Sequence, residues 1–226
     1  MPNIVNALMT YVRNTKGKYN YFSQSAYMRK YGWSGTDRTK LGGVWTGATG
    51  KKDIQGKEIY GLGGACYGFS AAYLISPPHS CNVENYFHLP KTQSIIRGVM
   101  NLQYQHYHVA LAYTSLPREE IFNEIVRIEG HIRYRGMVRL SRVSASALMN
   151  ELVMNGKHEI NMVNASVGHS VALKIAARDI CFFDSNLGEI IYPNDFVGRK
   201  KMEGALHMVF HSQYRTYTTM SVSNFI

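Results

Sequence analysis

Hydrophobic residues recur at helical spacing in several segments of the first 155 residues. The segments are residues 3–13, 66–76, 92–113, 117–129 and 145–154. In residues 66–76 the repeat falls on Phe69, Ala72 and Tyr73, and Pro77 ends it. Ser144 stands where an N-cap is needed, and residues 117–129 open with Pro-Arg-Glu-Glu, a favourable helix start. The pattern predicts a helix in each of these segments.

The pattern changes after residue 156. Short runs rich in β-branched and aromatic residues alternate there with turn residues, which is typical of strands. The runs are residues 158–166, 168–177, 179–184, 189–193 and 204–222. Helices followed by an antiparallel sheet predict an α+β fold. No repeat or linker divides residues 1–226, so we expect a single domain. Residues 1–60 are rich in Gly, Tyr, Lys and Thr and are compatible with an N-terminal extension or prosegment.

The amino-acid composition favours a folded domain and argues against several other classes of protein. The 226 residues are 45% hydrophobic and only 18% charged, which suits a folded domain with a sizeable core. Nothing approaches 18 consecutive apolar residues, so no membrane span is expected, and the N-terminus lacks the apolar stretch of a Sec signal. The cysteines Cys66, Cys81 and Cys181 are odd in number and form no disulfide framework, which favours a protein with reduced thiols.

The net charge of +10 favours acidic partners, such as nucleic acid, an anionic membrane or an acidic protein. The basic residues are scattered, however, and the longest run is Arg199-Lys200-Lys201. Scattered charge is more typical of a solvated surface than of a nucleic-acid footprint.

Cys66 opens the predicted helix of residues 66–76 directly after Gly63, Gly64 and Ala65. At a helix N-terminus the free amides and the helix dipole stabilise a thiolate, and the same amides can stabilise an oxyanion. The small residues before the cysteine leave room for a substrate backbone. A buried, inert thiol is the other interpretation of this residue.

His169 and Asp184 lie on two predicted strands that are joined by a turn near Arg178 and Asp179. A hairpin around that turn would bring the two residues together across the two strands, and we expect them opposite each other. A carboxylate beside a histidine orients the imidazole and supports its protonated form. Each residue alone has a structural explanation, His169 in the strand and Asp184 in a local turn.

The order Cys66, then "GHSVALKI", then "CFFDSNLGE" resembles the YopT/AvrPphB-type cysteine proteases, which are bacterial effectors with a papain-like fold. The resemblance covers residues 66–76 and 160–196. It implies Cys66 as nucleophile, His169 as general base and Asp184 as orienting acid, with the Cys66 backbone N–H as an oxyanion donor. A side-chain amide shortly before the cysteine would be the second donor; its identity is unassigned, and Gln55 is the nearest amide upstream.

The resemblance further implies a cysteine protease without metal or organic cofactor. It would leave the bacterium by a non-Sec route and cleave a protein in the host cytoplasm. Residues 77–91 and 193–204 are the expected specificity loops.

Other functions use some of the same residues. A peptidoglycan amidase of NlpC or CHAP type, a glutamine deamidase and a transglutaminase-like enzyme all use a similar thiol and histidine. A non-enzymatic, basic module could bind nucleic acid or membrane through tyrosines such as Tyr104, Tyr107 and Tyr113.

A metal site has little support in the sequence. His106 and His108 are spaced by one residue but lack a third ligand, and His79 near Cys81 is equally weak. The remaining histidines near the C-terminus, at positions 207 and 211, are expected in the last part of the sheet.

Overall fold

The computed structural model describes residues 4–31, 48–52, 58–60, 66–77, 83–99, 123, 126–127, 132–152, 155–164 and 168–226. Its helices are α1 (Ile4–Asn14), α2 (Gln24–Lys30), α3 (Cys66–Ile75), α4 (Val83–Phe87), α7 (Ala145–Glu151) and α8 (Phe196–Gln213). Residues 90–99, 123 and 126–127 are also helical. The strands are β1 (Lys18–Tyr21), β2 (Ala48–Lys52), β3 (Glu58–Tyr60), β4 (Tyr134–Leu140), β5 (Lys157–Val163), β6 (Gly168–Ile175), β7 (Asp179–Asp184), β8 (Gly188–Pro193) and β9 (Thr219–Phe225).

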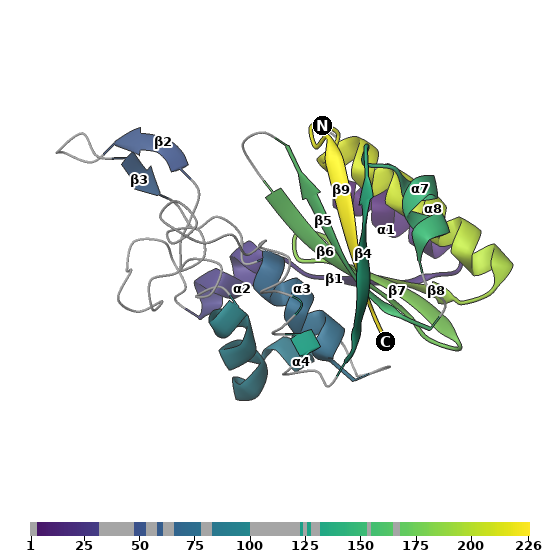
Figure 1. Cartoon of the computed structure of the whole chain (residues 1–226), viewed down its shortest axis with the longest axis horizontal. Coiled ribbons are helices and arrows are strands. Elements are labelled where there is room, and N and C mark those ends of the chain that lie inside the picture. The colour runs from purple at the N-terminus through teal and green to yellow at the C-terminus, as the bar shows by residue number, and fades with distance from the viewer. Residues whose placement is uncertain are drawn as a thin grey trace.

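Within the described residues, seven strands form one sheet in the order β1-β8-β7-β6-β5-β9-β4, and every neighbouring pair is antiparallel. Strands β2 and β3 pair separately. Figure 1 shows α1, α7 and α8 on one face of the large sheet, and α3 on the other face with α2 and α4 beyond it. The predicted α+β class is confirmed.

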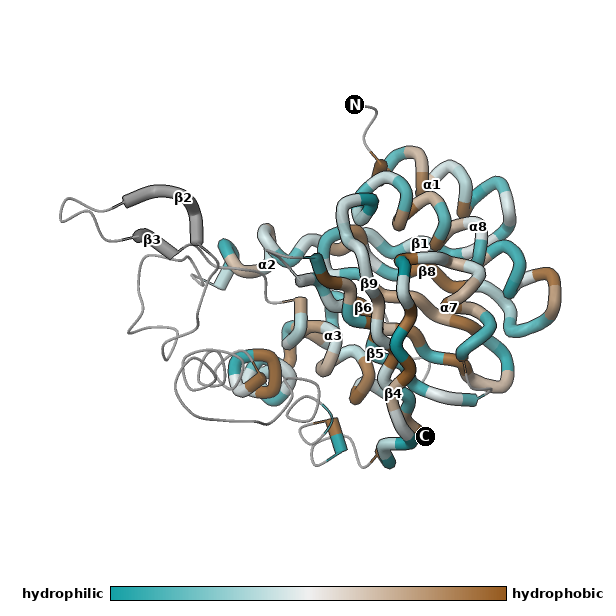
Figure 2. The backbone as a smooth tube through the Cα atoms, turned by 45° about the horizontal axis from the view of Figure 1, so that its top comes forward, coloured by the Kyte–Doolittle hydropathy of each residue, from teal (hydrophilic) through white to brown (hydrophobic). Residues whose placement is uncertain are grey.

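Hydrophobic cores lie on both faces of this sheet. Along β6, Val171 and Leu173 pack with α1, α7 and α8, whereas Ala172 between them packs with α3. On β7, Phe182 packs in the core with α1, α7 and α8, and its neighbour Phe183 packs in the core with α3. Burial on both faces explains why these strands are nearly continuous hydrophobic runs. Figure 2 shows the hydrophobic stretches gathered in the sheet and on the helix faces against it, with hydrophilic residues on the outer turns of α1 and α8.

The helix predictions are confirmed where the structure describes the residues. Helix α1 matches the prediction for residues 3–13, α3 matches 66–76, and α7 matches most of 145–154. The Ser144 side chain accepts from the Ala147 N–H, as expected of an N-cap. Residues 90–99 are helical, in agreement with the start of the helix predicted at 92–113, whereas residues 100–113 and most of the helix predicted at 117–129 lie outside the described residues. Strand β4 was not expected from the sequence.

Helix α8 corrects the prediction for the C-terminal region. Residues 204–213 were predicted as sheet and residues 193–204 as a loop, but one helix spans Phe196–Gln213, and only β9 follows the expected pattern. Buried positions recur along α8 every three or four residues: Gly198, Met202, Ala205, Leu206, Val209 and Phe210. The N-cap is Asp195, whose carboxylate accepts from the Gly198 N–H at 2.6 Å. This periodicity outweighs the β-branched residues nearby.

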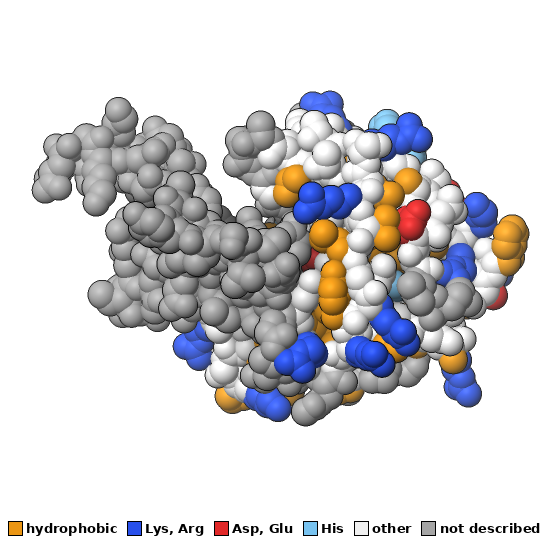
Figure 3. Space-filling model, in the orientation of Figure 1, with side chains coloured by type: hydrophobic (Ala, Val, Ile, Leu, Met, Phe, Trp, Pro, Cys, Tyr) orange, Lys and Arg blue, Asp and Glu red, His pale blue; other side chains and the backbone are white. Residues whose placement is uncertain are grey.

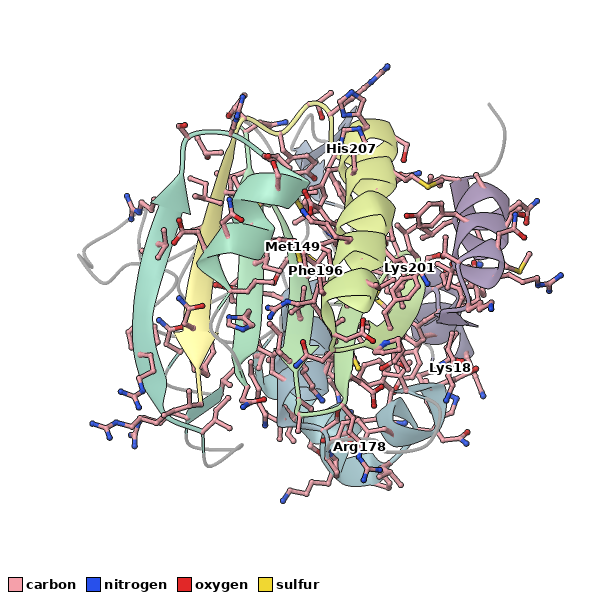
Figure 4. The ribbon with its side chains drawn as sticks, turned by 90° about the vertical axis from the view of Figure 1, so that its right-hand side faces the viewer. Lys18, Met149, Arg178, Phe196, Lys201 and His207 are labelled. Atoms are coloured by element: carbon pink, nitrogen blue, oxygen red, sulfur yellow. The ribbon has the colours of Figure 1, made fainter. Side chains whose placement is uncertain are left out.

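Helix α8 lies between α1 and α7 (Figure 4). The Tyr11 hydroxyl of α1 donates to the Lys201 carbonyl at 3.3 Å, and Met149 of α7 packs against the same core. Close contact at the start of α8 requires a glycine, because a Cβ at Gly198 would lie 2.0 Å from the Pro193 carbonyl oxygen. No helix in the described part of the chain is long and apolar enough to cross a membrane.

Candidate active site

Cys66 is the first residue of α3, as the sequence predicted. The residue is only 6% exposed. Helix α3 is buried along almost its whole length and packs against β5, β6 and β7. The cysteine is therefore held by a rigid helix, and its own N–H belongs to the first helical turn, where amides point away from the helix.

His169 and Asp184 lie on the hairpin of β6 and β7. The register pairs Ala172 with Phe183, so its continuation by one residue places Asp184 opposite Val171. His169 is two residues further along, which makes it a diagonal neighbour of Asp184 rather than its direct partner. This corrects the expected register. The Ala176 N–H donates to the Asp179 carbonyl, so the turn lies at residues 177–178. His169 stands eight residues before this turn and Asp184 only six residues after it, which leaves the two residues offset by two positions.

The diagonal arrangement still joins the two side chains. His169 Nε2 lies 3.2 Å from Asp184 Oδ1. Both residues are buried, with exposed fractions of 5% for His169 and zero for Asp184. In this water-poor setting an ion pair is screened little, so the carboxylate acts strongly on the imidazole.

The protonation of His169 follows from these surroundings. Burial alone lowers the pKa of His169, but the charge of Asp184, its hydrogen bond and the hydrogen bond with Cys66 outweigh burial. Together they raise the pKa from its usual 6.5 to about 10. The ring is therefore an imidazolium at neutral pH, in contact with both Cys66 and Asp184.

The loop that follows Asp184 is fixed by the N-terminal part of the chain. Asp184 Oδ1 accepts from the Asn186 backbone N–H at 2.8 Å. Gln24 of α2 holds the same loop twice: its N–H donates to the Ser185 carbonyl at 2.6 Å, and its side-chain amide donates to Asn186 Oδ1 at 2.6 Å. Residues near position 24 therefore help to hold the carboxylate in place. Whether residues 1–60 form a separate extension stays a prediction.

Tyr214 is a residue of the site that sequence reasoning missed. It caps the C-terminus of α8 and is 5% exposed. Its ring stacks on the His169 ring, with centroids 4.7 Å apart. Its hydroxyl lies 2.8 Å from His169 Nε2 and 2.5 Å from Asp184 Oδ2. The predicted strand through this region concealed it, since only the end of a helix brings Tyr214 to this point.

Comparison by sequence finds no matching protein family and no matching curated protein. Comparison of structures finds the crystal structure of the Pseudomonas avirulence protein AvrPphB, with a TM-score of 0.55 and 16% sequence identity. The match covers 72% of this chain and 91% of that one. The chain has a papain-like fold. In this fold a central helix, here α3, carries the candidate nucleophile against an antiparallel sheet. At this identity the likeness is one of fold, and it leaves activity to be argued from the site.

Cys181 and Lys174 face each other on β6 and β7 away from this chemistry. Burial, helped by the carboxylate of Glu189, raises the pKa of the Cys181 thiol to about 12. Burial and the charge of Lys157 lower the pKa of Lys174 to about 7. The Lys174 ammonium donates to the Ser76 hydroxyl at 2.5 Å and to its carbonyl at 3.0 Å, which ties the end of α3 to the sheet. Cys181 is thus a thiol held in its protonated form.

Most of the other candidates from the sequence are not among the described residues. Gln55, His79, Cys81, His106, His108, Tyr104, Tyr107 and Tyr113 lie outside the described residues. His207 and His211 lie on α8 rather than in the sheet, exposed, with their rings 4.7 Å apart. Among the described residues, no group of three or more His, Cys, Asp or Glu could hold a metal ion. On the face seen in Figure 3, Lys and Arg side chains are spread over the described surface.

Proposed function

We propose that the protein is a papain-like cysteine protease with Cys66 as nucleophile, His169 as general acid and base, and Asp184 as the group that orients the ring. The observation that carries the proposal is the buried His169 ring, which lies 3.2 Å from Asp184 and forms a hydrogen bond with Cys66. These contacts raise the pKa of His169 to about 10 against the effect of burial. A histidine that stays protonated beside a thiol stabilises the thiolate, the reactive form of cysteine.

The proposed reaction conserves protons at each step. The Cys66 thiolate attacks the substrate carbonyl carbon, and the Cys66 backbone N–H donates to the oxyanion. His169 gives its proton to the leaving amine, and the C–N bond breaks to leave a thioester. His169, now neutral, takes a proton from water as the water attacks the thioester. The acid product leaves, and the thiolate and imidazolium are restored.

The proposed setting is that of a bacterial effector. The structural neighbour is an avirulence protein of Pseudomonas, and the sequence resembles the YopT/AvrPphB-type proteases at both candidate segments. We assign the chain the same kind of role: export by a non-Sec route and cleavage of a protein in the host cytoplasm. The net charge of +10 favours an acidic surface on that substrate or an anionic membrane beside it.

The test compares new protein N-termini in a eukaryotic lysate after incubation with wild type, Cys66→Ala or Cys181→Ala. The last variant is the matched control, because its thiol is held protonated away from the site. We expect the same new N-termini with wild type and Cys181→Ala, and none with Cys66→Ala.

Other products would overturn the protease assignment and identify the chemistry. Ammonia release without chain cleavage would show a glutamine deamidase. Peptide release from purified cell wall, without new N-termini in the lysate, would show a peptidoglycan amidase. Cleavage that survives Cys66→Ala would remove the thiol from the mechanism.

A further inference from the structure

The Tyr214 hydroxyl lies between the base and the acid of the candidate triad. Its oxygen is 2.5 Å from Asp184 Oδ2 and 2.8 Å from His169 Nε2. The direct contact between His169 Nε2 and Asp184 Oδ1 is longer, at 3.2 Å. The hydroxyl is thus nearer to both groups than they are to each other.

The number of protons fixes the direction of these hydrogen bonds. An ionised carboxylate only accepts, so the single hydroxyl proton of Tyr214 goes to Asp184 Oδ2. The hydroxyl oxygen then has lone pairs left for His169, so His169 Nε2–H is the donor. That N–H is shared between the Tyr214 oxygen and Asp184 Oδ1, and the other ring nitrogen, Nδ1, is left for the contact with Cys66.

We propose that Tyr214 is a positioning residue of the proposed protease, which anchors the Nε2–H of His169 so that the ring exchanges its proton only at Nδ1, toward Cys66. This inference rests on the proposed function. Without the hydroxyl, the N–H keeps only Asp184 Oδ1, at 3.2 Å, as an acceptor among the described residues, and Asp184 Oδ2 loses the hydrogen bond from Tyr214.

The ring of Tyr214 supports the same role. It lies nearly parallel to the His169 ring, with 22° between the planes, and Tyr217 packs edge-on against it at 5.5 Å. The stacked ring excludes water from one side of the imidazole, which strengthens the hydrogen bonds there. Burial first, and the charge of Asp184 next, keep the pKa of Tyr214 well above its usual value, so the phenol keeps the proton that it donates.

The test uses Tyr214→Phe, which keeps the stacked ring and removes only the hydroxyl. The probe is iodoacetamide, and the readout is the alkylation rate of Cys66 as a function of pH, followed by mass spectrometry. Loss of a hydrogen bond to a charged group should raise the pH of half-maximal rate by about 1–2 units, so that the rate at pH values below the wild-type midpoint falls about 10- to 100-fold. The pH of half-maximal rate should move toward the ordinary thiol value of about 8.5. With a substrate in hand, kcat should fall while KM stays unchanged.

Tyr217→Phe is the matched control. Its ring borders the same site, and the charges of Cys66 and Asp184 both reach its hydroxyl, but among the described residues that hydroxyl makes no hydrogen bond to the triad. We expect the Tyr217→Phe profile to match wild type. Equal profiles for the two variants would overturn the role of Tyr214, whereas a wild-type protein without preferential Cys66 alkylation at pH 6 would instead contradict the proposed function.

Thermal melting of both variants separates a folding defect from a change in chemistry. Should Tyr214→Phe fail to fold, the wild-type protein still tests the inference by NMR with ¹⁵N-labelled histidine. We expect a bonded proton on His169 Nε2 with cross-relaxation to the Tyr214 hydroxyl proton. An Nε2 without a proton at neutral pH would overturn the assignment.

Discussion

The two described cysteines give opposite predictions for alkylation at pH 6. A Cys181 thiol with a pKa of about 12 has a thiolate fraction of about 10⁻⁶ at that pH. The Cys66 thiolate, paired with a protonated His169, should be nearly fully formed. The thiolate fractions of the two cysteines at pH 6 therefore differ by about 10⁶. A thiolate of low pKa is a weaker nucleophile, however, and a Brønsted coefficient of about 0.4–0.5 lowers the expected ratio of the two reaction rates by roughly 10³ to 10⁴. We therefore expect Cys66 to react at least about 100-fold faster than Cys181.

The assay is a brief reaction with limiting iodoacetamide, followed by digestion and quantification of the two cysteine peptides. Unfolded protein is the control, because its two thiols should react at similar rates. Solvent exposure alone would make Cys181 react faster, because Cys66 is buried and Cys181 is only partly buried. An excess at Cys66 therefore cannot come from exposure. Equal labelling of the folded protein at pH 6 would refute the thiolate–imidazolium pair.

Four further substitutions test separate parts of the structure. Asp184→Asn should leave the fold intact and slow cleavage about 10³- to 10⁴-fold, as in other triads; an unchanged rate would remove Asp184 from the site. Gly188→Ala should cost several kcal/mol in denaturant unfolding, because its φ is +113° and a Cβ would lie 2.1 Å from the Asn20 carbonyl oxygen. Gly136→Ala, with φ +138° and open space around it, should cost only about 1–3 kcal/mol from backbone strain, and equal losses would contradict the clash. Lys174 has a folded pKa of about 7 against 10.5 when unfolded, so between these values the unfolded chain binds the extra proton. Wild-type stability should therefore rise with pH from 7 to 9 relative to Lys174→Met, by at most about 1.4 kcal/mol per pH unit, and parallel curves would show that Lys174 is not desolvated.

Local patterns predicted the part of the site that is local in sequence. His169 and Asp184 are 15 residues apart on one hairpin, so strand and turn signals alone brought them together. Their exact offset depended on which residues form the turn, which composition does not determine. Cys66 was placed at a helix start by its glycines and the apolar run after it, but its contact with His169 spans about a hundred residues and had support only from family resemblance.

Tyr214 shows why the rest could not be predicted. It is 45 residues from His169, and no motif marks it. Its position depends on the end of α8, which was merged with the β-branched and aromatic residues of 214–222 into one predicted strand run. The buried positions from Gly198 to Phe210 carry a helical period, and this period was the signal that could have corrected the prediction.

The central claim is that His169 is a protonated ring held between Cys66 and Asp184. The most direct measurement is an NMR titration of the His169 ring in the folded wild-type protein. The stabilisation expected from a pKa of about 10 instead of 6.5 is roughly 5 kcal/mol in favour of the imidazolium. We predict chemical shifts of an imidazolium that persist through pH 8 and change only near pH 10. A ring that titrates near 6.5 would contradict the account.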